Sequence, residues 1–135
     1  MGKIFLIGRI IYGGFFVFNG INHFLRLEMM SGYTASKGVP LPTAFVIITG
    51  IMILMGGASI ITGIYPRIGV ILLVLFLLPV SIIMHNFWAI EDLMTKSIDM
   101  VNFLKNFSLA GAALMMLAIP TPWIMSFKIG WFKSS

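Results

Sequence analysis

TAFVIITGIMILMGGASIITG, residues 43–63, and IGVILLVLFLLPVSIIMHNF, residues 68–87, are two apolar runs separated only by Ile64-Tyr65-Pro66-Arg67. Each run is about 20 residues long, which is the length that an α-helix needs to cross the ~30 Å hydrocarbon core of a bilayer. A connection this short forces the two helices to lie antiparallel as direct neighbours. The sequence therefore predicts a transmembrane helical hairpin.

Two further runs of similar length flank this hairpin, at residues 4–24 and 101–119. The chain has 135 residues, of which 59% are hydrophobic and 10% charged, so little sequence is left for a soluble domain. The first run contains Arg9 and lacks a small-x-small cleavage site, so we expect a retained helix and not a signal peptide. We predict one all-α domain over residues 1–135, an integral membrane four-helix bundle with spans at approximately 4–24, 43–63, 68–87 and 101–119.

The segments between and after the runs carry the turn-forming residues. Residues 25–42 contain two glycines and two prolines, which predict an ordered or re-entrant loop without a long helix. Residues 89–97 mix apolar and charged positions at near-helical spacing, which predicts a short surface helix. The tail from Trp123 to Lys133 is aromatic and basic, as expected for a segment in the headgroup region.

The charges indicate the membrane orientation. The formal net charge is +5, and no cysteine is present, which excludes disulfides, thiolate metal sites and CxxC chemistry. Grouping the span ends by side gives five Lys and Arg residues against four, and we predict both termini on the cytoplasmic side of a bacterial inner membrane. Because these charges flank the membrane, the basic balance does not indicate nucleic-acid binding. The richer side holds Lys3, Arg9, Arg67, Lys128 and Lys133.

Small residues and one arginine have structural roles. Gly56, Ser59 and Gly63 share one helix face, which favours close packing within the monomer, with a homodimer seam as the alternative. We expect Arg9 to reach the cytoplasmic headgroups along its own stem. The alternative is a buried hydrogen bond from Arg9 to Thr62, to Tyr65 or to a carbonyl at the cytoplasmic ends of the second and third helices.

Polar residues inside the spans gather toward one leaflet. Antiparallel threading brings together the end of the first run, the end of the third and the start of the fourth. Intramembrane polar groups usually have either a partner or a function, so this cluster is the candidate ligand-binding site. Its members are Asn19, Asn22, His23, His85, Asn102, Lys105 and Asn106.

Three interpretations of the cluster remain open. Helix ends near the interface tolerate His, Asn and Lys without any function. A polar pocket can instead accept the head group of a quinone or another lipid-like molecule, because His, Asn and Lys all supply hydrogen-bond donors. In the third interpretation, His23 and His85 are the axial ligands of a haem.

The order of several motifs resembles that of the DoxX family, small and mostly bacterial four-helix membrane proteins. They are Arg9 followed by Asn19-Gly20-Ile21-Asn22-His23, Gly38-Val39-Pro40-Leu41-Pro42, Gly56-Gly57 with Gly63-Ile64-Tyr65-Pro66-Arg67, His85-Asn86-Phe87-Trp88, and Asn102-Phe103-Leu104-Lys105-Asn106. Relatives include a subunit of a thiosulfate:quinone oxidoreductase and a component of a membrane-bound oxidoreductase complex. The resemblance therefore implies a redox-linked membrane subunit near the quinone pool.

One departure from the family bears on catalysis. Many members carry a glutamate in the second helix, three residues after a glycine, where this chain has Gly50 and then Ile53. Ile53 cannot accept a proton, which makes an accessory subunit a better expectation than an independent enzyme. The competing class is a membrane scaffold or assembly factor that docks a larger membrane or redox partner through its glycine faces. A transporter or channel is a weaker third option, because the spans show no ring of charge.

Overall fold

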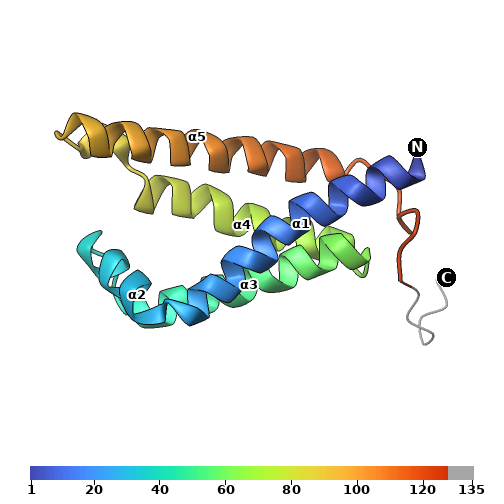
Figure 1. The fold of residues 1–135 in the computed structure, drawn as a ribbon, viewed down its shortest axis with the longest axis horizontal. Helices are drawn as coiled ribbons and strands as arrows, with labels where there is room; N and C mark the ends of the chain where they lie inside the picture. Colours follow the sequence, from blue (N-terminus) through green and yellow to red (C-terminus); the bar gives the residue numbers. More distant parts are fainter. Residues whose placement is uncertain (128–135) are drawn as a thin grey trace.

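The structure is a computed structural model, and it describes residues 1–127 of the chain. These residues form five α-helices and one short 3-10 helix, without a β-strand (Figure 1). The predicted all-α class is confirmed, but the count of four helices is not. The elements are α1 Gly2–Leu25, α2 Leu27–Ser36, α3 Pro42–Thr62, α4 Pro66–Met84, the 3-10 helix η1 Phe87–Ala89, and α5 Leu93–Met116.

Three helices of the described chain are long and apolar enough to cross a membrane. They are Gly2–Leu25, Pro42–Thr62, and Pro66–Ala89, in which α4 is counted together with η1. α5 forms as a 24-residue helix. It does not reach the same hydropathy because it contains Lys96, Asp99 and Lys105. Three of the four predicted spans therefore have the length and composition of a span.

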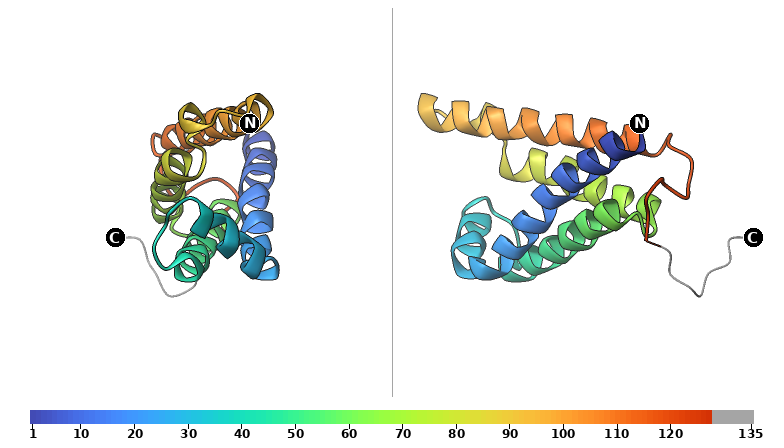
Figure 2. Two further views of the ribbon diagram at one scale, coloured as in Figure 1. Left: turned by 90° about the vertical axis from the view of Figure 1, so that its left-hand side faces the viewer. Right: turned by 45° about the vertical axis from the view of Figure 1, so that its right-hand side comes forward.

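The long helices pack in the order α1, α3, α4, α5. α1 lies along α3, α3 packs on α4, and α4 packs on α5. α1 and α5 lie close together near the N-terminus and then diverge toward the end of the bundle that carries α2 (Figures 1 and 2). We call this the α2 end; it comprises α2, the start of α3, the end of α4 and the start of α5. The main hydrophobic core, which includes Phe16, Ile53, Ile60 and Leu73, joins α1, α3, α4 and α5.

The α3–α4 hairpin is confirmed, since α3 ends at Thr62 and α4 begins at Pro66. Pro79 lies inside α4 without ending it. The first connection differs from the expected loop because it contains the ten-residue helix α2. Its turn-forming residues are concentrated after this helix, at positions 38–42, and only one glycine lies within it.

The predicted surface helix at 89–97 is wrong, because α5 already begins at Leu93 and continues through the fourth apolar run. The Asp92 side chain caps this helix by accepting a hydrogen bond of 2.8 Å from the Thr95 backbone N–H. The side-chain and backbone hydrogen bonds from Thr95 hold the pKa of Asp92 below its usual range. This cap therefore persists at neutral pH, and its contribution to helix stability is lost only as the pH falls through that lowered pKa.

Arg9 of α1 caps the C-terminal end of α3. Its guanidinium donates to the Ile60 and Ile61 carbonyls at 2.9 and 2.8 Å. The last four carbonyls of a helix have no partner within it. Here the Ser59 carbonyl accepts from the Gly63 N–H and the Thr62 carbonyl from the Phe127 N–H, so all four are satisfied.

The expectation that Arg9 reaches the headgroups is therefore wrong. The side chain is 1% exposed, and it also donates to the Ile124 carbonyl at 2.8 Å. Its guanidinium lies 5.6 Å from the centroid of the Phe5 ring and 5.5 Å from that of Trp123. The alternative interpretation, buried hydrogen bonding to carbonyls at the end of the second span, is the one that the structure contains.

The expected placement of the tail in the headgroup region fails for Trp123, which is 3% exposed and packs edge-on against Phe5. The segment that follows α5 turns back under the end of the bundle, where Arg9 and the α3 C-terminus hold it. The tail beyond residue 127, including Lys128 and Lys133 of the charge count, lies outside the described residues.

Glycines allow the helices to approach closely within one chain. A Cβ at Gly56 would lie 2.6 Å from a methyl carbon of Leu73 on α4, and Gly63 is enclosed by Arg9 and Ser126. Both glycines are buried, so they do not form an exposed face for a homodimer or a partner protein. Gly63 also adopts a φ of 72° at the end of α3, a conformation that favours glycine.

α1 and α3 approach closely where Gly13 of α1 faces Gly57 of α3. A Cβ at either position would lie 2.6 Å from the carbonyl oxygen of the other, which is backbone and cannot move aside. We expect Gly57→Val to separate α1 from α3 and to lower the free energy of unfolding by about 2–3 kcal/mol. Denaturant unfolding in detergent micelles measures this change. Gly111→Val is the matched control, since nothing lies within 4 Å of a Cβ there, and equal losses in both variants would contradict the crossing.

Candidate ligand-binding cavity

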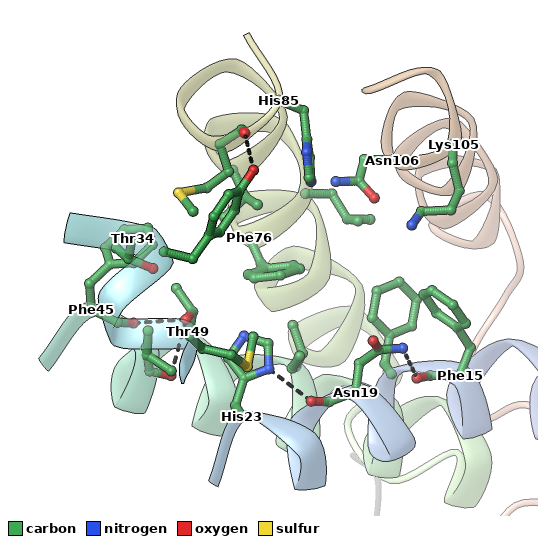
Figure 3. A pocket seen from close by; sticks show the side chains of 18 of the residues that line it. Phe15, Asn19, His23, Thr34, Phe45, Thr49, Phe76, His85, Lys105 and Asn106 are labelled. Atoms are coloured by element: carbon green, nitrogen blue, oxygen red, sulfur yellow. Dashed lines mark hydrogen bonds between the residues drawn. The ribbon is translucent and has the colours of Figure 1, made fainter. Parts of the chain in front are cut away.

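A cavity of about 460 Å³ lies at the α2 end, where α1 and α5 diverge. All five α-helices contribute to its walls. The walls are mainly apolar and include the aromatic rings of Phe15, Phe16, Phe45 and Phe76 (Figure 3). A mostly apolar cavity of this size with a few polar groups is typical of a site for a small hydrophobic ligand.

Five of the seven predicted site residues line this cavity. α1 contributes two of them, α5 two more, and the fifth directly follows α4 (Figure 3). Residues 80 or more positions apart in the sequence therefore face the same cavity, as the antiparallel threading predicted. They are Asn19, His23, His85, Lys105 and Asn106.

The other two predicted residues do not line the cavity. Asn102 accepts a hydrogen bond of 3.0 Å from the Lys105 ammonium and is not part of the cavity lining. Asn22 directly precedes His23, so its side chain leaves α1 in a different direction from the side chains that face the cavity. Both asparagines serve below as controls that match the chemistry of the cavity residues.

His23 is held on the α1 side of the cavity. Its Nδ1 lies 2.8 Å from the Asn19 carbonyl oxygen one turn earlier in α1. The side chain is 8% exposed, and its ring packs edge-on against Phe76 at 6.1 Å between centroids. The imidazole is therefore fixed in orientation, with Nε2 as the nitrogen available to a ligand.

His85 belongs to a charged cluster that closes the α2 end. Its Nδ1 lies 3.2 Å from Oδ1 of Asp99, and the Lys37 ammonium lies 3.1 Å from Oδ2 of the same carboxylate. Lys37 also donates to Oδ1 of Asn86 at 3.1 Å. Asp99 is 5% exposed, so this carboxylate is a buried group that joins the α2–α3 connection, the end of α4 and the start of α5.

Asp99 and Lys37 were missed as site residues because the sequence was divided at residue 101. The helical spacing of Asp99, Asn102 and Asn106 places these side chains on one side of a helix, which extending α5 backwards would have revealed. Nothing in the sequence indicates that Lys37 pairs with Asp99, because this contact depends on how α2 packs on the bundle. Tyr33 was missed for the same reason; it lines the cavity and donates to the Met84 carbonyl at 3.3 Å.

Asn106 is a buried polar group without a protein partner. It is 7% exposed and lines the cavity, and no hydrogen bond connects its side chain to the rest of residues 1–127. A buried carboxamide normally has its donors and acceptor satisfied. Its position next to the cavity therefore indicates that water or a ligand satisfies it (Figure 3).

Asn106→Leu tests this interpretation, because leucine has a similar volume and needs no hydrogen bond. We expect the free energy of unfolding to stay within about 1 kcal/mol of the wild-type value, since no hydrogen bond to the protein is lost and the apolar side chain suits the cavity wall. Ligand binding in the cavity should fall at the same time. Thermal unfolding in detergent gives the first quantity; a clear loss of stability would show that the carboxamide supports the fold. Asn102→Leu is the control and should leave ligand binding unchanged.

Among the His, Cys, Asp and Glu side chains of the described chain, His23 and His85 are the two that line the cavity. Within residues 1–127 no group of three or more His, Cys, Asp and Glu side chains is arranged to hold a metal ion. His23 and His85 each have Nδ1 engaged and Nε2 available. Both lie at the α2 end of the bundle, as their sequence positions indicated.

Fold and cavity together define a small, all-helical membrane protein with a mostly apolar internal cavity. The chain matches the DoxX family over residues 4–86, and it belongs to that family. It is also 31% identical over 125 residues to the inner membrane protein YphA of Escherichia coli (strain K12), covering 91% of this chain and 86% of YphA. No solved structure matches the chain.

The family match covers α1 to α4 and ends at Asn86. Lys105, Asn106 and Asp99 on α5 lie beyond it. Ile53 is 0% exposed and forms part of the cavity wall. An apolar side chain at this position leaves α3 without a carboxylate in the cavity.

Proposed function

We propose that this DoxX-family protein is a small redox-linked subunit associated with the quinone pool or a membrane oxidoreductase complex. Its cavity would hold the head group of an isoprenoid quinone. The observation that carries the proposal is the convergence of His23, His85 and Asn106 on one apolar cavity within the bundle. A quinone ring needs flat apolar walls together with a few polar groups at its oxygen atoms.

The divergence of α1 and α5 supports entry from the lipid. At the α1–α5 side, the Lys105 ammonium lies 5.9 Å from the centroid of the Phe15 ring, and both residues line the cavity. This cation–π pair is one of the contacts between α1 and α5. An isoprenoid tail could pass between them into the bilayer while the head group stays inside.

We propose that the chain is an accessory subunit. Its roles would be to bind the quinone and to stabilise the charge on it electrostatically. Lys105 would stabilise negative charge on the ligand when it is reduced. Electrons would come from a partner oxidoreductase, because the described residues contain no cysteine and no metal cluster site. The apolar Ile53 supports this division, since it offers no proton acceptor.

The proposed topology has four crossings, with α5 as the fourth and both termini in the cytoplasm of a bacterial cell. The similarity to an inner membrane protein supports the location. The antiparallel packing of α4 and α5 supports the fourth crossing, because α5 runs beside α4 over most of its length. The charged first half of α5 is compatible with this crossing, since Asp99 pairs with Lys37 inside the protein.

The test is the binding of radiolabelled decylubiquinol to the protein in lipid nanodiscs under anaerobic conditions, with empty nanodiscs to correct for partition into lipid. We expect saturable binding to the wild-type chain and its loss in the His23→Ala/His85→Ala double variant. Asn22→Leu, one residue from His23 but outside the cavity lining, should bind as the wild type does. Unchanged affinity in a folded double variant would remove the proposal.

A further inference from the structure

Three of the polar residues that line the cavity, Asn19, His23 and His85, share one hydrogen-bonding orientation. His23 Nδ1 lies 2.8 Å from the Asn19 carbonyl oxygen, which can only accept a hydrogen bond. Nδ1 must therefore carry the proton. In a neutral imidazole with Nδ1 protonated, Nε2 has a lone pair and acts as an acceptor.

The same reasoning fixes His85. Its Nδ1 lies 3.2 Å from Oδ1 of Asp99, and Oδ2 of the same carboxyl group accepts from the Lys37 ammonium at 3.1 Å. Because Asp99 forms a salt bridge with Lys37, it acts as an acceptor, so Nδ1 of His85 carries the proton and donates it. His85 Nε2 is then an acceptor in the neutral ring, as in His23.

The charges around the two rings favour neutral imidazoles. His23 contacts a carbonyl and the Phe76 ring, and it pairs with no carboxylate among residues 1–127. Beside His85, the single negative charge of Asp99 is already balanced by Lys37, and the Lys105 cation faces the same cavity. A further positive charge on either ring would be buried without compensation, which is costly.

Asn19 follows the same pattern. Its Nδ2 donates to the Phe15 carbonyl oxygen at 2.7 Å, so the amide must present nitrogen to this carbonyl and leave Oδ1 on its other side (Figure 3). In each of these three cavity side chains, the hydrogen-bond donor is therefore used by an acceptor of the protein itself. Each retains an acceptor for a ligand, Nε2 in His23 and His85 and Oδ1 in Asn19.

We propose that the cavity recognises the reduced, hydroxyl-bearing form of its ligand, the hydroquinone, in preference to the oxidised quinone. This inference rests on the proposed quinone-linked function. The hydroxyls of a hydroquinone donate to the Nε2 atoms of His23 and His85. One of the two hydroxyl oxygens can at the same time accept from the unpartnered Asn106 amide. A quinone carbonyl has no proton to donate, so it leaves the imidazole acceptors unsatisfied in an apolar site.

The test compares three probes that share one ring and one decyl tail, on the wild-type protein in nanodiscs under anaerobic conditions. They are decylubiquinol, decylubiquinone, and the dimethyl ether of the quinol, which has no hydroxyl proton. We expect the quinol to bind at least about tenfold more tightly than the other two, because a lost hydrogen bond to a buried acceptor has that effect on affinity. Quinone affinity equal to or higher than quinol affinity would overturn the preference and leave the proposed function standing. Binding of none of the three would remove both.

A pair of variants separates the acceptor role from simple packing. Replacing His23 by phenylalanine keeps a flat ring but removes the acceptor, so we expect the quinol-to-quinone affinity ratio to fall toward one. Asn22→Leu should leave the ratio at its wild-type value. A folded His23→Phe protein that keeps the full preference for the quinol would show that the imidazole nitrogen is not the acceptor that recognises the hydroxyl.

Discussion

Arg9→Leu should lower the free energy of unfolding by about 3–5 kcal/mol, the largest loss that we expect from a single substitution in this chain. The change removes the donors for the Ile60, Ile61 and Ile124 carbonyls. These acceptors are in an apolar environment, where an unsatisfied carbonyl keeps its full desolvation penalty. Denaturant titration in micelles, followed by circular dichroism, measures the loss.

Two further variants make the Arg9 prediction specific. Arg67→Leu removes an exposed cation from the start of α4 and should change stability by less than about 0.5 kcal/mol. Arg9→Lys keeps the charge but lacks the planar fork that reaches three carbonyls, so it should recover only part of the loss. Full stability in Arg9→Lys would mean that the charge alone is sufficient, and a small effect of Arg9→Leu would contradict the cap itself.

Asp99→Leu should lower the free energy of unfolding by about 2–4 kcal/mol. The substitution leaves the Lys37 ammonium and the His85 Nδ1–H without their shared acceptor at the α2 end. Breaking one side of a buried ion pair is costly because the remaining charge has lost its compensation. We also expect weaker ligand binding, because His85 would no longer be held in one orientation.

The Lys37→Met/Asp99→Leu double variant checks this explanation through a double-mutant cycle. Removing both charges should be less harmful than the sum of the two single changes, since no uncompensated charge remains. Glu91→Leu, an exposed acid that precedes α5, is the control and should have little effect. Additive effects of the two single changes would show that Lys37 and Asp99 do not stabilise each other.

The apolar runs predicted the long helices well because their length and composition are dictated by the bilayer. Both helices of the hairpin begin and end within two or three residues of the predicted spans. The start of α5 was placed eight residues too late, because Lys96 and Asp99 suggested a loop where the folded protein pairs Asp99 internally. A hydropathy value counts a charged residue as unfavourable in a span, even where a residue that is distant in the sequence compensates its charge in the folded protein.

The environment of Arg9 could not be decided from the sequence. A side chain near a helix end can reach water or turn inward, and only the return of the segment at Trp123 and Ile124 brings an acceptor and an aromatic wall to it. The sequence allowed the Arg9 side chain to turn inward, but nothing in it favoured this orientation over the outward one. The same tertiary contact buries Trp123, which composition alone assigned to the membrane surface.

The candidate site was predictable where helix direction alone places residues together. Antiparallel threading was enough to associate His23 with His85 and with Asn106. It was not enough to exclude Asn102, because the exact rotation of α5 decides whether an asparagine faces the cavity or the Lys105 ammonium. Lys37 and Tyr33 entered the site only through the fold of α2.

Native mass spectrometry of the protein, released gently from its own membrane, tests the central claim most directly. We predict an added mass equal to one isoprenoid quinone or quinol per chain in the wild type, and its loss in the His23→Ala/His85→Ala variant. A chain that carries no quinone, whether alone or bound to a larger protein, would contradict the account. The polar residues of the cavity would then be hydrated helix ends without a ligand.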